Sequence, residues 1–177
     1  KNELNFTETA INKLIIFHDY LIKWNTKYNL ISKSTEKDVW MRHILDSAQL
    51  IRFIKDLRKG SISDLGTGAG FPGIILAIYY NNSSFHVKLV EKSPVKRAFL
   101  KKIIDKLNLN AEIMDNAYNK GVSADIIVCR AFKKLREIIK ISREILIKPH
   151  KLIILKGKDA QVEINNLSLE KNYSYSL

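Results

Sequence analysis

The sequence predicts an α/β fold in which a mostly parallel sheet has helices on both faces and follows an N-terminal helical extension. From Ser61 onward, short apolar strands alternate with amphipathic helices, which is the order of a parallel sheet. Before that point, apolar residues recur at helical spacing. A chain of 177 residues has the size of one domain. We therefore expect one domain over 1–177, with a helical segment over 1–58, an α/β core over 61–157 and a tail over 158–177.

The helical segment is expected to contain two helices with inward-facing apolar residues. The first helix begins near Thr7, and its stripe consists of Ile11, Leu14, Ile15, Leu21, Trp24 and Tyr28. The second helix is expected to bury Met41, Ile44, Leu45, Ala48, Ile51 and Ile54. Thr35, with Asp38 three residues later, resembles a capping arrangement before this second helix.

The α/β core is expected to contain five strands and three helices. The strands are expected at Ile62–Leu65, His86–Glu91, Ala111–Asp115, Asp125–Cys129 and Leu152–Lys156. The helices are expected near Gly73–Tyr80, Pro94–Leu107 and Leu135–Ile147. The polar tail after Lys158 shows no further convincing strand.

The chain is strongly basic, with a net charge of +12 and an isoelectric point near 9.7. Such a balance suits a polyanionic partner, because lysines and arginines displace counterions from phosphates. AT-biased codon usage also enriches lysine, isoleucine and asparagine, so the positions of the charges have to decide. The single cysteine, Cys129, excludes an internal disulfide and a cysteine-rich metal site. We expect a cytoplasmic monomer with no bound metal and no membrane association.

The run Asp64–Gly73 (DLGTGAGFPG) carries the strongest local signal for a ligand. It follows a strand and opens a helix, as a nucleotide-binding glycine loop does. Glycine accepts positive φ and allows close backbone approach. A tight turn without a ligand is the alternative, but four glycines within eight residues argue against it. The spacing G-x-G-x-G favours S-adenosylmethionine over a dinucleotide, and Gly66, Gly68 and Gly70 are the expected donor contacts of the loop.

Ligands of open α/β sheets bind beyond the carboxyl ends of the strands. The expected strand ends carry two groups of charged residues: Asp64, Glu91, Asp115, Arg130 and Lys156. The three carboxylates would face the amino group, ribose and adenine of the donor. The two cations would face a methyl acceptor. Glu91 is alternatively a surface carboxylate at a strand end.

The helix expected from Pro94 begins with an unusual placement of positive charge. Ser93 resembles its N-cap, and Pro94 suits its first position. Lys96 and Arg97 then lie in the first turn, where the helix dipole disfavours cations. Contact with phosphates would explain this placement, and two solvated cations would explain it equally well.

Two kinds of base methylation are disfavoured by the residues present. Transfer to pyrimidine C5 needs a nucleophilic cysteine, and Cys129 is expected to fill the core instead. Transfer to an exocyclic amine is commonly marked by an Asn/Asp-Pro-Pro-aromatic motif, which the chain lacks. Guanine N7 loses no proton on methylation, so positioning supplies most of the rate. No general base is then needed.

From about Trp24 to Gly157, the chain resembles the bacterial 16S ribosomal RNA guanine-N7 methyltransferases, the glucose-inhibited division protein B family. The matching pieces are Trp24-Asn25 with Tyr28-Asn29-Leu30, Arg42-His43-Ile44-Leu45-Asp46-Ser47, the loop Asp64–Gly73, Lys96-Arg97 with Phe99-Leu100, Arg130-Ala131-Phe132 and Leu155-Lys156-Gly157. The glycine loop is common to many methyltransferases, whereas Arg-His-x-x-Asp-Ser followed by Arg-Ala-Phe is quite specific.

The resemblance implies a Rossmann-like class I methyltransferase that methylates N7 of a guanine in the 530 loop of 16S ribosomal RNA. It implies donor contacts at Gly66, Phe71, Glu91, Ala117, Tyr118 and Arg130. It also implies a basic acceptor pocket formed by Lys96, Arg97, Arg130 and Lys156, with Arg130, Lys96 and Lys156 as the catalytic candidates. His43 and Asp46 would either tie the helical segment to the sheet or form a satisfied surface pair.

The chain differs from the family pattern in two places. Lys92-Ser93 stands where the family often has Asp-Ser, which shifts the expected ribose contact by a residue or two. The family also usually continues past this chain's end with a closing antiparallel hairpin.

Three other functions remain open. A small-molecule methyltransferase would have a closed apolar pocket, and a non-catalytic ribosome-assembly factor would bind RNA without methylating it. A nicotinamide-dependent oxidoreductase would bind a different cofactor.

Overall fold

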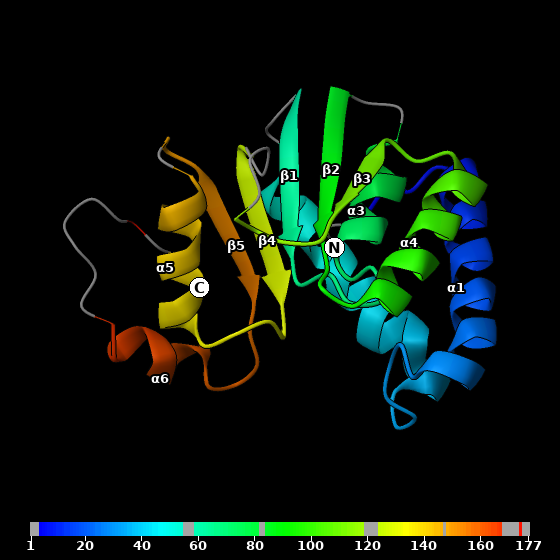
Figure 1. Cartoon of the computed structure of the whole chain (residues 1–177), viewed down its shortest axis with the longest axis horizontal. Coiled ribbons are helices and arrows are strands. Elements are labelled where there is room, and N and C mark those ends of the chain that lie inside the picture. Colours follow the sequence, from blue (N-terminus) through cyan, green and yellow to red (C-terminus); the bar gives the residue numbers. More distant parts are fainter. Residues whose placement is uncertain are drawn as a thin grey trace.

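The structure is a computed structural model, and it describes residues 4–54, 59–81, 84–118, 124–146, 148–167 and 174. In this part of the chain, five parallel strands form one sheet with the order β3-β2-β1-β4-β5 (Figure 1). The strands are β1 (Lys59–Leu65), β2 (Ser84–Val90), β3 (Ala111–Met114), β4 (Ile126–Arg130) and β5 (Lys151–Leu155). The parallel sheet and its five strands are confirmed, with ends within three residues of the expected ones.

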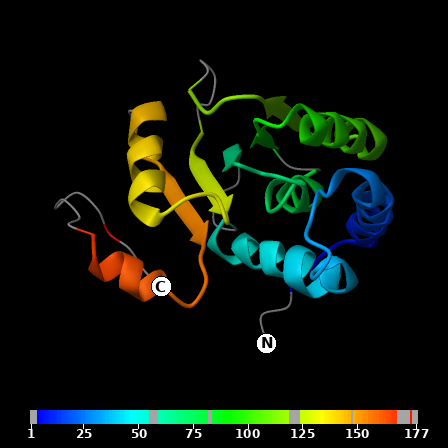
Figure 2. The ribbon, with the colours of Figure 1, turned by 60° about the horizontal axis from the view of Figure 1, so that its bottom comes forward.

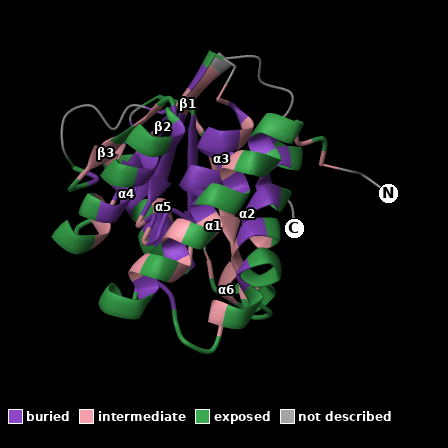
Figure 3. Ribbon diagram, turned by 90° about the vertical axis from the view of Figure 1, so that its right-hand side faces the viewer, coloured by how far each residue is buried: buried purple, intermediate pink, exposed green. Residues whose placement is uncertain are grey.

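Helices cover both faces of the sheet, as Figures 1 and 2 show. The first face is covered by α1 (Glu8–Tyr28), α3 (Gly73–Tyr79) and α4 (Pro94–Leu107). The second face is covered by α5 (Leu135–Ile145). Each face encloses its own apolar core, and Figure 3 shows buried residues concentrated along the sheet and the inner sides of the helices. The expected end of α5 at Ile147 lies outside the described residues.

Helix α1 begins next to Thr7, as expected, and the Thr7 hydroxyl oxygen caps it by accepting a hydrogen bond from the Ala10 amide at 3.2 Å. Its buried stripe is Ala10, Leu14, Phe17, Leu21 and Asn25. The expected inward positions of Ile11, Ile15 and Tyr28 were therefore wrong, since these residues are exposed. The stripe is rotated because the Phe17 ring lies in the core, 5.3 Å from the ring of Phe71 between centroids.

The second helical stretch is not one regular helix. It consists of η1 (Glu36–Asp38), the π-helical turn η2 (Trp40–Leu45), α2 (Asp46–Ala48) and η3 (Gln49–Phe53). Ile44, Ala48, Ile51 and Ile54 are buried as expected, whereas Met41 and Leu45 are exposed. The expectation for these two residues was wrong because a π turn uses more residues per turn than an α-helix and shifts the inward face.

Two further details concern the ends of this arrangement. Thr35 is not a side-chain cap; its hydroxyl donates to the Ser32 carbonyl oxygen at 3.1 Å, so the expected capping arrangement was wrong. Within the described residues, no strand follows β5. The short helix α6 (Ala160–Asn165) follows instead and lies near α5.

Candidate active site

The glycine loop between β1 and α3 lies at the carboxyl edge of the sheet and is fixed by hydrogen bonds to the β2 end. The amides of Gly66 and Thr67 donate to the Val90 carbonyl oxygen at 2.9 and 3.0 Å. The Gly68 amide donates to Oε2 of Glu91 at 2.9 Å. Because β1 and β2 are parallel neighbours, the sheet register itself brings Glu91 to the loop.

Glycine is needed at three positions of this loop for different structural reasons. Gly66, Gly68 and Gly70 all have positive φ, at 71°, 61° and 98°. A Cβ on Gly66 would lie 2.3 Å from the Phe132 ring, and one on Gly70 would lie 2.5 Å from Ile74. At Gly68, the nearest atom would be a backbone oxygen 3.9 Å away. Packing therefore explains Gly66 and Gly70, and Gly68 has open space in front of it for a ligand.

Asp64 lies beneath the loop and is fully buried, with 0 % exposure. Its Oδ2 accepts a hydrogen bond from the Gly73 amide at 2.7 Å, and burial raises the pKa of its carboxyl to about 7. The Thr67 hydroxyl lies close enough to the Asp64 carboxyl to oppose this rise in pKa, but within the described residues neither this hydroxyl nor Oδ1 of Asp64 makes a hydrogen bond of normal geometry. Buried polar atoms are normally satisfied, so these two atoms suit a polar or cationic ligand such as the amino group of S-adenosylmethionine. The expectation singled out Asp64 but missed Thr67.

Glu91, just after β2, connects the glycine loop with the start of α4. While Oε2 accepts from Gly68, its Oε1 accepts from the Ser93 amide at 2.7 Å. A carboxylate oxygen has two lone pairs, so a ribose hydroxyl can still bind there. The role of Glu91 at the ribose stays a prediction.

The start of α4 has the expected form, with Ser93 at the N-cap, Pro94 in the first turn and the Ser93 hydroxyl accepting from the Lys96 amide at 3.4 Å. Nη1 of Arg97 donates to the carbonyl oxygens of Glu91 and Lys92, so this guanidinium holds the β2–α4 loop. Within the described residues, the Lys96 side chain makes no hydrogen bond or ion pair. Of the two cations, Lys96 is the one with an uncommitted charged group.

Arg130, at the end of β4, connects the sheet to the helical segment. Its Nη1 donates to the Arg42 carbonyl oxygen at 2.9 Å and to Oδ2 of Asp46 at 3.1 Å. Its Nη2 lies 2.6 Å from Nδ1 of His43. The guanidinium also lies over the Phe71 ring, 5.2 Å from its centroid. His43 and Asp46 thus tie the helical segment to the sheet, and Arg130 is the partner that sequence reasoning did not assign to them.

Lys156, after β5, is bound within the fold. Its ammonium donates to the Lys133 carbonyl oxygen at 3.0 Å and to both carboxylate oxygens of Glu163 at 2.8 Å. The same Glu163 accepts from the Leu135 amide at the start of α5. The Lys156 ammonium is therefore engaged by protein partners, and Glu163 would compete with an RNA phosphate for it.

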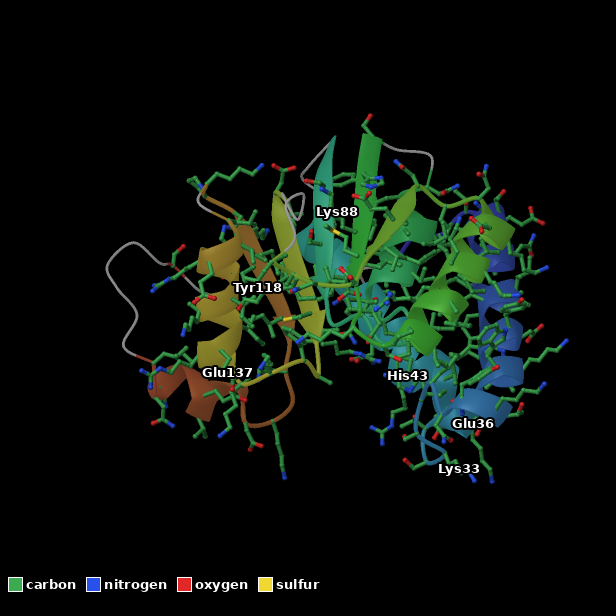
Figure 4. All side chains as sticks on the ribbon, in the orientation of Figure 1. Lys33, Glu36, His43, Lys88, Tyr118 and Glu137 are labelled. Atoms are coloured by element: carbon green, nitrogen blue, oxygen red, sulfur yellow. The ribbon has the colours of Figure 1, made fainter. Side chains whose placement is uncertain are left out.

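The segment after β3 extends toward α5. Ala117 is buried in the second core, and the exposed Tyr118 donates from its hydroxyl to Glu144 at 3.0 Å. Figure 4 shows Tyr118 on the α5 side of the sheet and His43 on the side of the helical segment. Asp115 lines a hollow of about 600 Å³ between α4 and β3, which the glycine loop does not line. Their donor contacts stay predictions.

Cys129 is buried in the second core, and burial raises the pKa of its thiol to about 12. A thiol held neutral among apolar side chains is a packing residue, as expected. Among the described residues, no cluster of three or more metal-ligating side chains occurs. The helices of the described part are also too short or too polar to cross a membrane.

The comparisons agree on one family. A family model described as rRNA small subunit methyltransferase G matches residues 10–176. The chain is 36 % identical over 176 residues to ribosomal RNA small subunit methyltransferase G of Orientia tsutsugamushi, covering 98 % of this chain and 85 % of that protein. It is 41 % identical over 156 residues to the protein of the same name in Rickettsia bellii, covering 88 % and 79 %.

Among solved structures, a putative S-adenosyl-L-methionine-dependent methyltransferase of Methanococcus maripaludis is similar, with a TM-score of 0.52 and 20 % identity. The match covers 87 % of this chain and 66 % of that one, and it supports the fold. The fold, the fixed glycine loop with the buried Asp64 beneath it and the family match agree. The chain belongs to the rRNA small subunit methyltransferase G family.

Proposed function

We propose that this chain transfers the methyl group of S-adenosylmethionine to N7 of a guanine in the 530 loop of 16S ribosomal RNA. The observation that carries the proposal is the open face of Gly68, in a glycine loop that is fixed to the end of β2 above the buried side chains of Asp64 and Thr67. They lie at the carboxyl edge of the sheet, where α/β enzymes bind their ligands.

The residues of the glycine loop fit the donor. Oδ1 of Asp64 would accept from its amino group, Gly68 would allow its close approach, and Glu91 would hold its ribose. Gly66, Gly70 and Phe71 shape the loop, and Asp115, Ala117, Tyr118 and Arg130 complete the expected donor contacts. When bound, the donor supplies an electrophilic methyl group on a sulfonium.

Transfer to guanine N7 asks little of the protein beyond alignment. The N7 lone pair forms the new bond to the methyl carbon as the carbon–sulfur bond breaks, and the sulfur keeps that bonding pair. No proton leaves the base, so a site without a general base suffices. Lys96, Arg97, Arg130 and Lys156 would orient the guanine and its phosphates, with Lys96 the most available of them.

The partner is proposed to be 16S ribosomal RNA, free or within the small ribosomal subunit, and the enzyme is proposed to act as a cytoplasmic monomer. The net charge of +12 supports a nucleic-acid partner. Acceptor pockets for small molecules are usually enclosed and apolar, whereas the candidate acceptor residues here are cations.

Transfer of labelled methyl to small subunits that lack the modification, followed by mapping of the labelled nucleotide, tests the proposal. We expect label on N7 of one guanine in the 530 loop. Label on another base or on a small molecule would overturn the proposed acceptor. Donor binding without any transfer would favour a non-catalytic RNA-binding role.

A further inference from the structure

A chain of hydrogen bonds runs from Arg130 to an exposed loop of the helical segment. Nη2 of Arg130 lies 2.6 Å from Nδ1 of His43, and Nε2 of His43 lies 2.9 Å from the Thr35 hydroxyl. The Thr35 hydroxyl lies 3.1 Å from the Ser32 carbonyl oxygen. Figure 4 shows His43 between the sheet and the outer part of this segment, where Lys33 is labelled.

The donors in this chain can be assigned by elimination. Arginine only donates, so Nδ1 of His43 must accept and carries no hydrogen. The neutral ring then carries its hydrogen on Nε2 and donates it to Thr35. Thr35 passes its own hydrogen to Ser32. Burial and the nearby Arg130 lower the pKa of His43 to about 4, which keeps the ring neutral near pH 7.

The loop at the far end of this chain carries groups that bind phosphates. Residues 32–34 and 37 are exposed, and they include Lys33 and Lys37. The hydroxyl groups of Ser32, Ser34 and Thr35 lie 2.9 to 3.0 Å apart in two pairs. Lysine and hydroxyl side chains are common phosphate ligands in nucleic-acid complexes. Glu36 and Asp38 reduce the local positive charge, so phosphate binding by this loop depends on how its lysines and hydroxyl groups face the RNA.

Apolar burial holds this segment in place alongside the hydrogen bonds. Val39 and Ile44, on either side of His43 along the sequence, are 1 % and 4 % exposed and hold the segment by apolar burial. His43 is only half-buried, and its ring stacks on Phe71 of the glycine loop with centroids 5.0 Å apart. The His43 ring therefore contacts the glycine loop, Arg130 and the loop 32–35.

We propose that His43 is a positioning residue that couples Arg130 in the active site to the loop 32–35, so that this loop contacts phosphates of the substrate RNA. The inference rests on the proposed function, because it takes ribosomal RNA as the substrate. It adds an RNA-contacting loop outside the predicted acceptor pocket and a defined tautomer that holds the loop in place.

Two substitutions of His43 separate the two ends of the chain. His43→Asn places an oxygen near the position of Nδ1 and keeps an acceptor for Arg130, but loses the donor to Thr35. His43→Gln places an amide near Nε2 and keeps the donor to Thr35, but loses the acceptor. We expect His43→Asn to raise KM for the RNA about fivefold, the effect of one hydrogen bond. We expect His43→Gln to lower kcat instead, with donor affinity kept in both.

Thr35 supplies an independent test of the same loop. Thr35→Val removes the hydroxyl without changing the shape and should reproduce the higher KM of His43→Asn. Thr35→Ser restores the hydroxyl and should return KM to the wild-type value. Thr26→Val is the matched control, because Thr26 is exposed and its hydroxyl, among the residues that the structure describes, bonds only to the Lys23 carbonyl within α1. Equal kinetics of Thr35→Val and Thr26→Val would overturn the proposal, as would equal losses of stability, kcat and donor affinity in both His43 variants.

The ring nitrogen spectrum of His43 tests the assigned tautomer without any RNA. In ¹⁵N NMR of the wild-type protein near pH 7, we expect an unprotonated Nδ1 and a protonated Nε2. A protonated Nδ1 would overturn the coupling. If the wild-type enzyme bound its donor but methylated no ribosomal RNA, the proposed function would fail, and the nitrogen spectrum would still decide whether His43 connects Arg130 to Thr35.

Discussion

Asp64→Asn should change both the pH dependence of folding and the pH dependence of donor binding. The carboxyl of Asp64 has its pKa raised from 3.8 to about 7 by burial. The folded state therefore holds this proton more tightly than the unfolded state, and stability falls as pH rises from about 4 to 7 and is level above. A gap of about 3 pKa units corresponds to about 4 kcal/mol.

The asparagine variant should lack this component. It keeps an oxygen for the Gly73 amide, and any constant cost of its new amide cancels when the variant is compared with itself at two pH values. Urea unfolding at pH 4.5 and pH 8 should therefore show that the wild type loses more stability across this range than the variant does. Asp125→Asn is a suitable control, because hydrogen bonds from Lys148 and Ser61 lower the pKa of Asp125 from its usual 3.8, so that this carboxylate stays ionised from pH 4.5 to 8 and its removal should leave the pH dependence unchanged.

Donor binding provides the second readout. If the donor's ammonium binds Oδ1 of Asp64, the carboxyl must ionise, and binding at pH 6 should release about 0.9 proton when the pKa is about 7. Calorimetric titration with S-adenosylmethionine in two buffers of different ionisation enthalpy measures this number. Equal heats of donor binding in the two buffers at pH 6 would refute the placement of Asp64 at the donor. The same proton release in Asp64→Asn as in the wild type would also refute it.

Three further predictions follow from the site geometry. Gly68→Ala should abolish donor binding and lower the folding stability by about 1 kcal/mol, because Gly68 has a positive φ. Gly66→Ala should lower the melting temperature further, because its Cβ would displace the Phe132 ring. Melting temperatures with and without donor measure both effects, and a donor-induced rise for Gly68→Ala would contradict this prediction. The pKa of His43 is lowered from 6.5 to about 4, so the stability of the protein should fall as pH drops from 6.5 toward 4. Urea unfolding at pH 5 and 7 should show that His43→Asn loses less stability between these pH values than the wild type does. An equal loss in the two proteins would argue against a neutral ring. Lys96→Ala should reduce the salt slope of RNA affinity by about one, while Lys23→Ala on α1 leaves it unchanged; equal slopes for the two variants would remove Lys96 from the interface.

The strands and α4 were predictable because the sheet's apolar runs are interrupted by turn residues and because Ser93-Pro94 marks a helix start. The inward face of η2 was not predictable, because a π turn is stabilised by its surroundings and has no pattern of its own. In α1, Phe17 and Ala10 define the buried stripe, but the sequence presents a competing stripe through Ile11 and Ile15 that is equally apolar.

The glycine loop was predictable as a ligand site, but the separate reasons for its glycines were not. Gly66 is required by Phe132, which is far away in the sequence and is brought to the loop by the pairing of β4 with β1. The cations were found as strand-end residues, yet their partners come from other segments. Lys156 is bound by Glu163, and Arg130 by His43 and Asp46, and such pairings depend on tertiary packing.

The hydrogen bonds that fix the glycine loop have a consequence for binding entropy. The amides of Gly66, Thr67, Gly68 and Gly73 already have partners within the protein. Folding has therefore met the cost of ordering this loop, and the donor meets a preorganised surface. Differences in affinity between donor analogues should then reflect their charge and shape, with little contribution from loop ordering.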